Sequence, residues 1–521
     1  MMNYLRYISI FMGLFFVSLI CISSSFAISP VDLEFSDLGS NLTISVNDSA
    51  NIKSDLKNLN SLDAHDLDES ILKSDEYKFS NKNIYINNCS MDLNYSSNIN
   101  SVNAISGNTF TDIQNAINNA KNGDNIVLNN IVYSGKGSFI SVNKSVNIIG
   151  NGAILDGKGS SLIMKVNSPN VNLTNIQFIN GYSEKYFDAG ALILDGNSNK
   201  CKVSDCVFKN NSGTQGTVYV YSDYTKFLNC NFTDNIGIAN RNKTIYKNTS
   251  VMSGGLNVEN NASYAYVSGC IFKGNIGRAG GGASLRGDYN TIENCTFISN
   301  QVNEGFSERS YAGALHVGPN NGSKSSASVL NCVFINNAVN NKLHIGHAGA
   351  LCFEDGSIMD NCTFINNYCE GVGGATTLHG SAVISNCVFI NCTATVCGGA
   401  ISTGYNEEVA KWSANFTDCY FEGNAAPIGG AVCAMGDGIR FSNSSFLENI
   451  AVSGGATYVQ GNNALFDNLS VINNSADLGG AFYIEGNSAI ITNNLLEGNN
   501  ANVGGGVVII GNNSNLNNIN I

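Results

Sequence analysis

Charged side chains, and basic ones above all, are scarce in this chain of 521 residues. Charged residues make up 13% of the sequence, and 27 basic residues are outnumbered by 40 acidic ones. The resulting net charge of −13 disfavours nucleic acid and anionic membranes as partners. Because about 25% charged residues is typical, the low value indicates a surface built largely from Asn, Ser and Gly.

Helical periodicity is lacking over most of the chain. Between Gly454 and Gly506 apolar and polar residues alternate in short runs, and Gly, Asn and Ser separate the runs. This pattern is typical of short strands joined by turns. One amphipathic helix is predicted, with Ile113, Ala116, Ile117 and Ala120 on its apolar face. We expect a capping box at Thr111-Asp112-Ile113-Gln114, an end at Gly123, and a helix that caps the strands that follow.

Instead of helices the sequence has a repeat of 25 residues. The second glycine of successive Gly-Gly pairs falls at Gly455, Gly480 and Gly505, where 480 − 455 and 505 − 480 both equal 25. The phrase Asn-Cys-x-Phe-x-x-Asn keeps the same period from Asn361 to Asn386. A fixed period of strands and turns predicts a solenoid in which each strand pairs in parallel with its equivalent one turn later. We therefore expect an all-β, single-stranded parallel β-helix.

Positions within the repeat predict which side chains face the core. Residues +2 and +4 after the second glycine, such as Phe482 and Ile484, are apolar and should point inward. Asn257 and Ser284 break this rule, so we expect a local bulge or a one-residue shift in those two rungs. The last Asn of the phrase should form a ladder along the axis, interrupted at Cys392.

The +3 position of the repeat is expected to face outward. It holds tyrosine at Tyr219, Tyr458 and Tyr483, and exposed tyrosines in such a column can offer a stacking surface to sugars. Ordinary exposed strand aromatics are the alternative.

The N-terminus has the features of a signal peptide covering residues 1–27. Arg6 precedes an apolar stretch from Tyr7 to Ile22, and small residues lead to Ala27. An uncleaved anchor is the alternative, although a spanning helix needs about 20 apolar residues. Residues 28–106, rich in Ser, Asn and Asp, are expected to be a mobile leader, and the β-helix to occupy 107–521. Because the chain stops inside a repeat, we expect either a fragment or an exposed final edge.

Specific motifs resemble known families over residues 107–521. Phe110 to Leu128, "FTDIQNAINNAKNGDNIVL", and the later "IIGNGAILDGKG" resemble the opening of pectin-lyase-like β-helix proteins. The Gly-Gly-Ala and Phe-x-x-Asn phrases resemble the repeats of chlamydial polymorphic outer-membrane proteins and of adhesin-like surface proteins of methanogenic archaea. The Asn-rich, Pro-poor composition favours the archaeal group. The resemblance implies a right-handed coil and a secreted, cell-surface adhesin-like role.

Long insertions interrupt the repeat and carry the candidate binding residues. The spacing from the ladder Asn to the glycine pair is 5 at Asn474/Gly479 but 19 at Asn235/Gly254. Related insertions before Ala312 and Ala348 should emerge from the same corner. Insertions on one face are where repeat proteins usually bind, so we expect an extracellular glycan or surface protein as the partner. The candidate residues are Tyr246, Phe306, Arg309, Tyr311, His344 and His347 at this edge and Trp412 at a second corner.

A secreted polysaccharide lyase or glycoside hydrolase is the alternative function. Hydrolysis needs two carboxylates facing one cleft, and the Asp-Asp pair of polygalacturonases is missing. The weak catalytic candidates are Glu354, Asp355 and His379, because 354 − 349 and 379 − 374 both equal 5 and therefore place Glu354 and His379 on neighbouring rungs. An ordinary surface ion pair is the other interpretation, and we assign no catalytic residue.

The sequence has 16 cysteines but no Cys-x-x-Cys pair. Eight of them occupy one column, where we expect small buried side chains, with scattered disulfides as the alternative. Zinc-site spacing is lacking, and Cys392 to Cys397 is a weak signal. We therefore expect no metal and no cofactor, with Ca²⁺ as the option that a lyase would use. Attachment to the cell envelope is expected through a region outside this chain.

Overall fold

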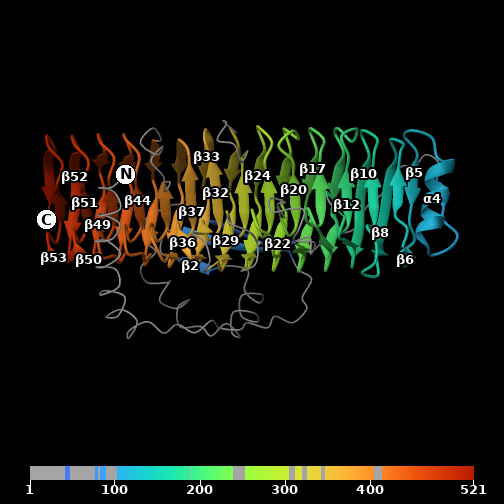
Figure 1. Cartoon of the computed structure of the whole chain (residues 1–521), viewed down its shortest axis with the longest axis horizontal. Helices are drawn as coiled ribbons and strands as arrows, with labels where there is room; N and C mark the ends of the chain where they lie inside the picture. The colour runs from blue at the N-terminus through green and yellow to red at the C-terminus, as the bar shows by residue number, and fades with distance from the viewer. Residues whose placement is uncertain are drawn as a thin grey trace, which may run out of the picture.

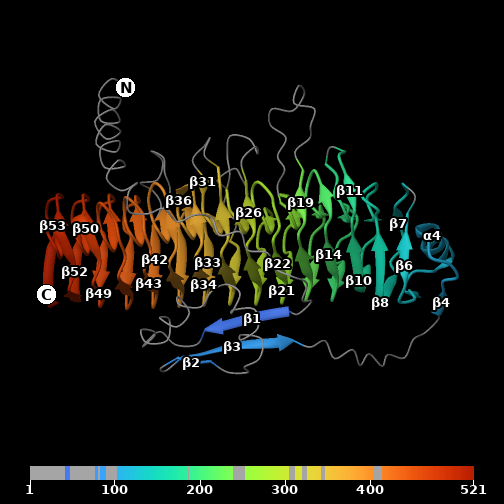
Figure 2. The same ribbon diagram turned by 90° about the horizontal axis from the view of Figure 1, so that it is seen from below.

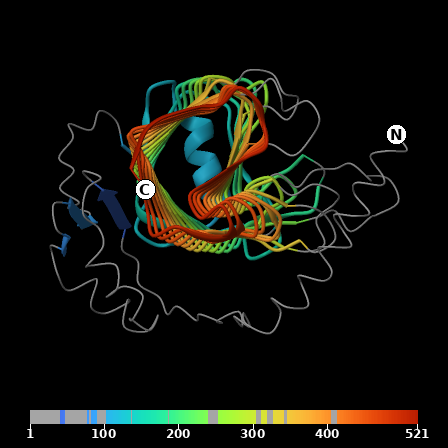
Figure 3. The same ribbon diagram turned by 90° about the vertical axis from the view of Figure 1, so that its left-hand side faces the viewer.

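The computed structural model describes residues 41–46, 77–79, 82–89, 102–135, 137–185, 187–238, 253–303, 311–318, 326–341, 346–403 and 413–520. From β4 (Val102–Ala104) to β55 (Asn515–Asn520) these residues form one long coil of short strands (Figure 1). The strands of the coil pair in parallel with their equivalents in the next turn. This confirms the predicted right-handed parallel β-helix, and Figure 3 shows the coil from its end.

One wall of the coil is a 14-stranded parallel sheet. Its neighbouring strands pair in register, as with Phe353 opposite Leu378, 25 residues later. The members are β7 (Ile140–Val142), β9 (Met164–Val166), β12 (Leu192–Leu194), β16 (Val218–Val220), β20 (Leu256–Val258), β23 (Ala283–Leu285), β27 (Leu315–Val317), β32 (Leu351–Glu354), β37 (Thr376–His379), β41 (Ile401–Thr403), β44 (Val432–Ala434), β47 (Thr457–Val459), β51 (Phe482–Ile484) and β54 (Val507–Ile509).

The predicted one-residue shift at Asn257 and Ser284 is present in this sheet. Leu256 pairs with Val218 and with Ala283, so Asn257 and Ser284 face outward and the apolar residues beside them face the core. The cause is local, because these rungs begin their strand one residue closer to the glycines.

The second large sheet has two strands in a turn such as that of β33 (Ser357–Asp360) and β34 (Thr363–Ile365); the Asn and Cys of the phrase lie between them and the Phe lies on the second. Its phenylalanines stack along the axis with neighbouring ring centroids 4.6 to 4.9 Å apart. The stack comprises Phe178, Phe208, Phe232, Phe272, Phe297, Phe334, Phe364, Phe389, Phe421 and Phe446. In the part of the chain described from residue 201 to 433, the cysteines are buried free thiols, which agrees with the predicted packing role.

The asparagine ladder is also confirmed. The Oδ1 of Asn300 accepts hydrogen bonds from the backbone N–H and the Nδ2 of Asn275, at 3.1 and 2.9 Å. The Nδ2 of Asn300 in turn donates to the Phe272 carbonyl. Cys392 interrupts the ladder as expected, although its N–H still donates to Asn424. The ladder satisfies buried polar groups in every turn, which explains why Asn recurs there.

The predicted helix is α4 (Phe110–Asn119), which lies at the end of the coil (Figures 1 and 3). Phe110, Ile113 and Ile117 are its buried residues. The capping box lies at Thr109 and Asp112, two residues earlier than predicted, because the Asp112 carboxylate closes the box that we had assigned to Gln114.

The region predicted as a mobile leader contains a small antiparallel sheet in its described part. It consists of β1 (Asn41–Val46), β3 (Lys82–Cys89) and β2 (Tyr77–Phe79), drawn beside the coil in Figure 2. The coil itself begins with β4, ahead of the predicted start at 107, because β4 pairs in parallel with β5 (Asn125–Val127).

Glycine pairs precede several strands of the 14-stranded sheet, as Gly373 and Gly374 precede β37. Gly373 has a φ of +68°, a left-handed conformation that costs L-residues energy. At Gly374 an added Cβ would lie 2.0 Å from the carbonyl oxygen of Gly399 in the next turn. The first glycine therefore supplies the turn and the second the close approach between rungs.

The outer face of the 14-stranded sheet is covered, which makes the prediction for the +3 tyrosines wrong. The segments that precede the glycine pairs lie over this face, so that Ala189 packs in one cluster with Tyr219, and Val372 in another with Tyr458. Tyr219 and Tyr458 are buried and Tyr483 is half-buried. They form a second apolar layer outside the coil and offer no exposed column for sugars.

Candidate functional site

A polar cluster lies within this covered outer layer, on three consecutive strands. His316 lies on β27, Cys352 and Glu354 on β32, and His379 on β37. Strand pairing places His316 opposite Cys352 and Glu354 opposite His379. Because residues two apart on a strand share a face, Cys352 and Glu354 both point to the outer side. We call these four residues the His-Cys-Glu cluster.

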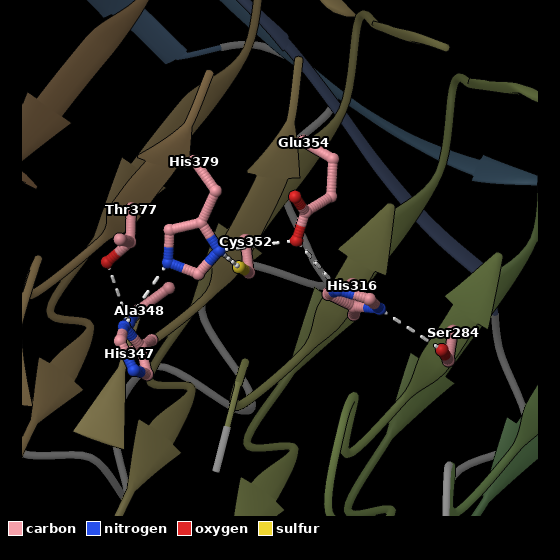
Figure 4. A network of polar contacts seen from close by, with 8 residues as sticks. All are labelled: Ser284, His316, His347, Ala348, Cys352, Glu354, Thr377 and His379. Atoms are coloured by element: carbon pink, nitrogen blue, oxygen red, sulfur yellow. Dashed lines mark hydrogen bonds and ion pairs between the residues drawn. The ribbon is translucent and has the colours of Figure 1, made fainter. Parts of the chain in front are cut away.

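The side chains of the His-Cys-Glu cluster converge on the Glu354 carboxylate (Figure 4). Its Oε1 lies 3.2 Å from His379 Nδ1 and 3.6 Å from His316 Nε2. Cys352 Sγ lies 3.6 Å from His379 Nδ1. The three donor atoms of His316, Cys352 and Glu354 all lie within 4.8 Å of one another. Histidine, thiol and carboxylate groups at such separations are the ligand types of a transition-metal site.

Burial makes the polar atoms of the cluster unusual. His316 and Cys352 are fully buried, and Glu354 is 5% exposed. His316 Nε2 has no hydrogen-bond partner, since its separation from Glu354 exceeds hydrogen-bond distance. A buried polar atom left without a partner costs about 1–3 kcal/mol, so the arrangement calls for an explanation.

Protonation in the cluster follows from burial and from the facing groups. Burial lowers the pKa of the His316 imidazole, because it disfavours the charged form. Burial likewise raises the pKa of the Cys352 thiol. For Glu354 burial acts to raise the pKa, but the facing His316 and His379 side chains outweigh it, so the pKa lies below its usual value. Glu354 is therefore a buried carboxylate.

Two further residues surround the cluster on its less buried side. His347 Nδ1 lies 3.3 Å from His379 Nε2, and the Tyr311 ring centroid lies 5.0 Å from that of His316. Tyr311 and His347 are half-buried. They come at the ends of the two insertions before Ala312 and Ala348, so the cluster lies at the base of the loop-bearing edge.

The structure separates the three weak catalytic candidates. Glu354 and His379 lie together, whereas Asp355 turns away and its Oδ1 accepts a hydrogen bond from the Ser381 backbone N–H at 2.7 Å. The Asp355 carboxylate therefore binds the backbone of a turn and does not join the cluster. Among the binding candidates, Tyr311 and His347 adjoin the cluster, and Tyr246, Phe306, Arg309, His344 and Trp412 lie outside the described residues.

His316 and Cys352 are the members that the sequence reasoning missed. Both lie at +3 after the second glycine, since 316 − 313 and 352 − 349 equal 3. This position had been interpreted as exposed, and metal sites had been sought only as local Cys-x-x-Cys spacing. Considering the residues at +3 and +5 in adjacent turns together would have identified all four members of the His-Cys-Glu cluster.

Comparison with known proteins gives likenesses of fold. No protein-family model matches the chain, and no curated protein matches it. Three solved structures with a similar backbone serve as examples. A PL6 alginate lyase in complex with trisaccharide has 12% identity and a TM-score of 0.42, over 75% of this chain and 86% of that one. PfbA, a surface adhesin of Streptococcus pneumoniae, has 9% identity and a TM-score of 0.33, over 74% and 87%. A tailspike protein of E. coli bacteriophage HK620 in complex with hexasaccharide has 14% identity and a TM-score of 0.39, over 78% and 76%.

Proposed function

We propose that the chain is a secreted, adhesin-like surface scaffold that binds an extracellular glycan or surface protein through one loop-bearing edge of the β-helix. The observation that carries this proposal is the position of the insertions. Their first residues lie on one ladder, which includes β19 (Ile236–Gly237), β26 (Gln301–Val302) and β30 (Ala338–Val339). Ile276 bridges the first two, and β26 pairs directly with β30. The same edge is labelled with β19 and β26 in Figure 2.

The insertions leave from one ladder, with the rung of Ile276 between the first and the second. Parallel strands in a sheet are about 4.8 Å apart, so the starting points of the three insertions lie close enough for one ligand to contact all of them. Tyr311 and His347 lie at the base of that surface, half-buried and aromatic. Aromatic rings with polar atoms suit both glycan and protein ligands.

The enzyme alternative is less well supported by the geometry. Glycoside hydrolysis needs two carboxylates across the scissile bond. Among the described residues, the His-Cys-Glu cluster and its neighbours offer one, Glu354, because Asp355 is held by Ser381. Glu354 is also buried, so a polysaccharide chain could not reach it without movement of the covering segment.

Secretion is part of the proposal and rests on the sequence of residues 1–27. Within the described part of the structure, no helix has the length and apolar character needed to cross a bilayer. Appearance of the protein in the medium or on the cell surface, and the N-terminal sequence of the mature chain, would test this part directly. An N-terminus that retains Met1 would contradict it.

The binding proposal is tested with the purified full-length protein on a panel of acidic and neutral polysaccharides, with and without Ca²⁺. Both retention and chain cleavage are recorded. We expect retention without cleavage, lost when the insertions at 239–252 and 304–310 are shortened. Cleavage of any polysaccharide, abolished by Glu354→Gln, would establish the enzyme instead.

A matched control shortens the loop at 404–412, which leaves from another corner. Retention that survives this change but not the first two assigns binding to the loop-bearing edge. Retention lost only with the 404–412 loop would overturn the assignment and move the site to the corner that carries Trp412. No retention on any polysaccharide would leave a surface protein as the partner, to be tested by binding to whole cells before and after protease treatment.

A further inference from the structure

We propose that the His-Cys-Glu cluster is a zinc site, with His316 Nε2, Cys352 Sγ, Glu354 Oε1 and His379 Nδ1 as the four ligands. The ligands come from three consecutive rungs, so the site binds neighbouring turns of the coil to one another. The proposal does not depend on the adhesin function, since metal binding is measured without any carbohydrate or partner.

The separations from Glu354 to both histidines and from Cys352 to His379 fit tetrahedral coordination, and the donor atoms of His316, Cys352 and Glu354 already lie within 4.8 Å of one another, so His379 would complete the set on metal binding. Zinc bonds of about 2.0–2.1 Å to nitrogen and oxygen, and about 2.3 Å to sulfur, place tetrahedral N···O pairs roughly 3.4 Å apart and N···S pairs roughly 3.6 Å apart. The observed N···O separations from Glu354 are 3.2 and 3.6 Å. The observed S···N separation from Cys352 to His379 is 3.6 Å.

Second partners of both histidines favour the tautomers that a metal requires. Ser284 Oγ lies 3.4 Å from His316 Nδ1 and can accept its proton, which leaves a lone pair on the unpartnered Nε2. His347 Nδ1 lies 3.3 Å from His379 Nε2 and can accept that proton, which puts the lone pair of the neutral imidazole on Nδ1, the nitrogen that faces Glu354 and Cys352. Metal-bound histidines almost always donate their other N–H to such a partner.

Charge gives an independent argument. The cluster holds a buried carboxylate, and its nearest ionisable neighbours are two imidazoles and a thiol. Among the described residues, no Lys or Arg lies within ion-pair distance of Glu354. One Zn²⁺ balances one thiolate and one carboxylate, and it fills the unmet bond of His316. A thiolate ligand and two imidazoles suit zinc and exclude the all-oxygen sites that Ca²⁺ and Mg²⁺ prefer.

The experiment measures metal binding by the full-length protein, purified under reducing conditions and treated with a chelator. Zinc content is determined after dialysis, and Co²⁺ is then titrated as a spectroscopic substitute. We expect about one metal per chain, tetrahedral Co²⁺ absorption in the visible, and a thiolate-to-cobalt charge-transfer band in the near ultraviolet.

Matched variants assign the ligands. Cys352→Ser should abolish the charge-transfer band and weaken zinc binding by at least ~10-fold, whereas Cys433→Ser, at the same position of a later rung, should change neither. Glu354→Gln should likewise weaken zinc binding, and Glu485→Gln, its counterpart in a later rung, should not. Far-ultraviolet circular dichroism checks that each variant is folded.

Three results would overturn the proposal. They are wild-type zinc content far below one per chain, Co²⁺ binding without a thiolate band, and a band that survives Cys352→Ser or disappears in Cys433→Ser. If Cys352→Ser does not fold, the wild-type cobalt spectrum still decides whether a thiolate is a ligand.

Discussion

Two carboxylates occupy the same outer column of the coil in different surroundings, Glu259 half-buried and Glu354 buried. Glu259 follows β20 and lies 2.6 Å from the Arg286 guanidinium, and it also accepts a hydrogen bond from the Tyr219 hydroxyl. Glu354, further along the same column, faces two histidines and a thiol. The chain supplies a permanently charged cation for the first carboxylate, whereas the second has in His379 a partner that is charged only when it is protonated.

The difference separates structural polar groups from those available to a ligand. In the Glu259 rung, Arg286 provides the compensating charge, and the coulombic attraction of Arg286 helps to hold the pKa of Glu259 below its usual value despite burial. In the Glu354 rung, one nitrogen of His316 has no partner. A buried polar atom without a partner is costly, so the rung of the second carboxylate is the one that indicates a binding site.

The largest effect is expected from breaking the structural pair. Arg286→Met leaves the half-buried Glu259 without its cation and should cost about 3 kcal/mol of unfolding free energy, measured by urea denaturation. The double variant Glu259→Gln with Arg286→Met should recover much of that loss. Zinc binding should remain in any variant that folds, and its loss in a folded Arg286→Met protein would show that the two regions are coupled.

Zinc itself should stabilise the wild-type protein. At a free concentration 100 times the dissociation constant, binding adds about 2.7 kcal/mol to the free energy of unfolding. Glu354→Gln should remove this increment while changing the metal-free protein by less than about 1 kcal/mol. Parallel urea titrations with zinc and with chelator measure both values, and an equal zinc increment in the variant would refute Glu354 as a ligand.

The asparagine ladder offers a second structural comparison. Asn300→Ala removes the acceptor for Asn275 and the donor for the Phe272 carbonyl, at a cost of about 2 kcal/mol. Asn197→Ala, at an exposed position, is the control and should change stability by less than about 0.5 kcal/mol. Equal effects of the two substitutions would show that the ladder contributes nothing specific.

The smallest expected effect is the pH dependence caused by core thiols. Burial raises the pKa of Cys201 to about 11 and that of Cys392 to about 12. Because the folded pKa exceeds the unfolded value of about 8.5, stability is complete below pH 8.5 and falls as the pH rises towards the folded pKa.

At pH 8 the loss is only about 0.2 kcal/mol for each such thiol. Urea denaturation under reducing conditions at pH 7, 8 and 9 measures the trend, and Cys201→Ala should make it shallower. Stability that stays constant or increases from pH 8 to 10 would contradict the assignment.

The parallel β-helix could be predicted because each turn of the coil corresponds to one repeat of the sequence. The 25-residue period fixes which residues stack, and short-range alternation fixes which of them face the core, so the Asn ladder followed from spacing alone. The same reasoning placed Glu354 beside His379. Reasoning from spacing succeeds for residues that contact only their equivalents in neighbouring turns of the coil.

The cluster could not be predicted in full because it depends on a covering segment that the period does not reveal. The +3 column reads as exposed until residues such as Ala348 and Val372 are seen to pack over it. Because these residues cover the column, the Cys352 thiol is buried and His316 Nε2 has no contact with water. The grouping of Asp355 with Glu354 and His379 failed for a similar reason, because the Asp355 carboxylate accepts a hydrogen bond from the Ser381 backbone instead.

X-ray absorption spectroscopy at the zinc edge of the full-length, zinc-loaded protein tests the central claim most directly. The account predicts four-coordinate zinc with one sulfur at about 2.3 Å and three nitrogen or oxygen ligands at about 2.0–2.1 Å. A first shell with no sulfur, or with two or more, would contradict the assignment of Cys352 with His316, Glu354 and His379.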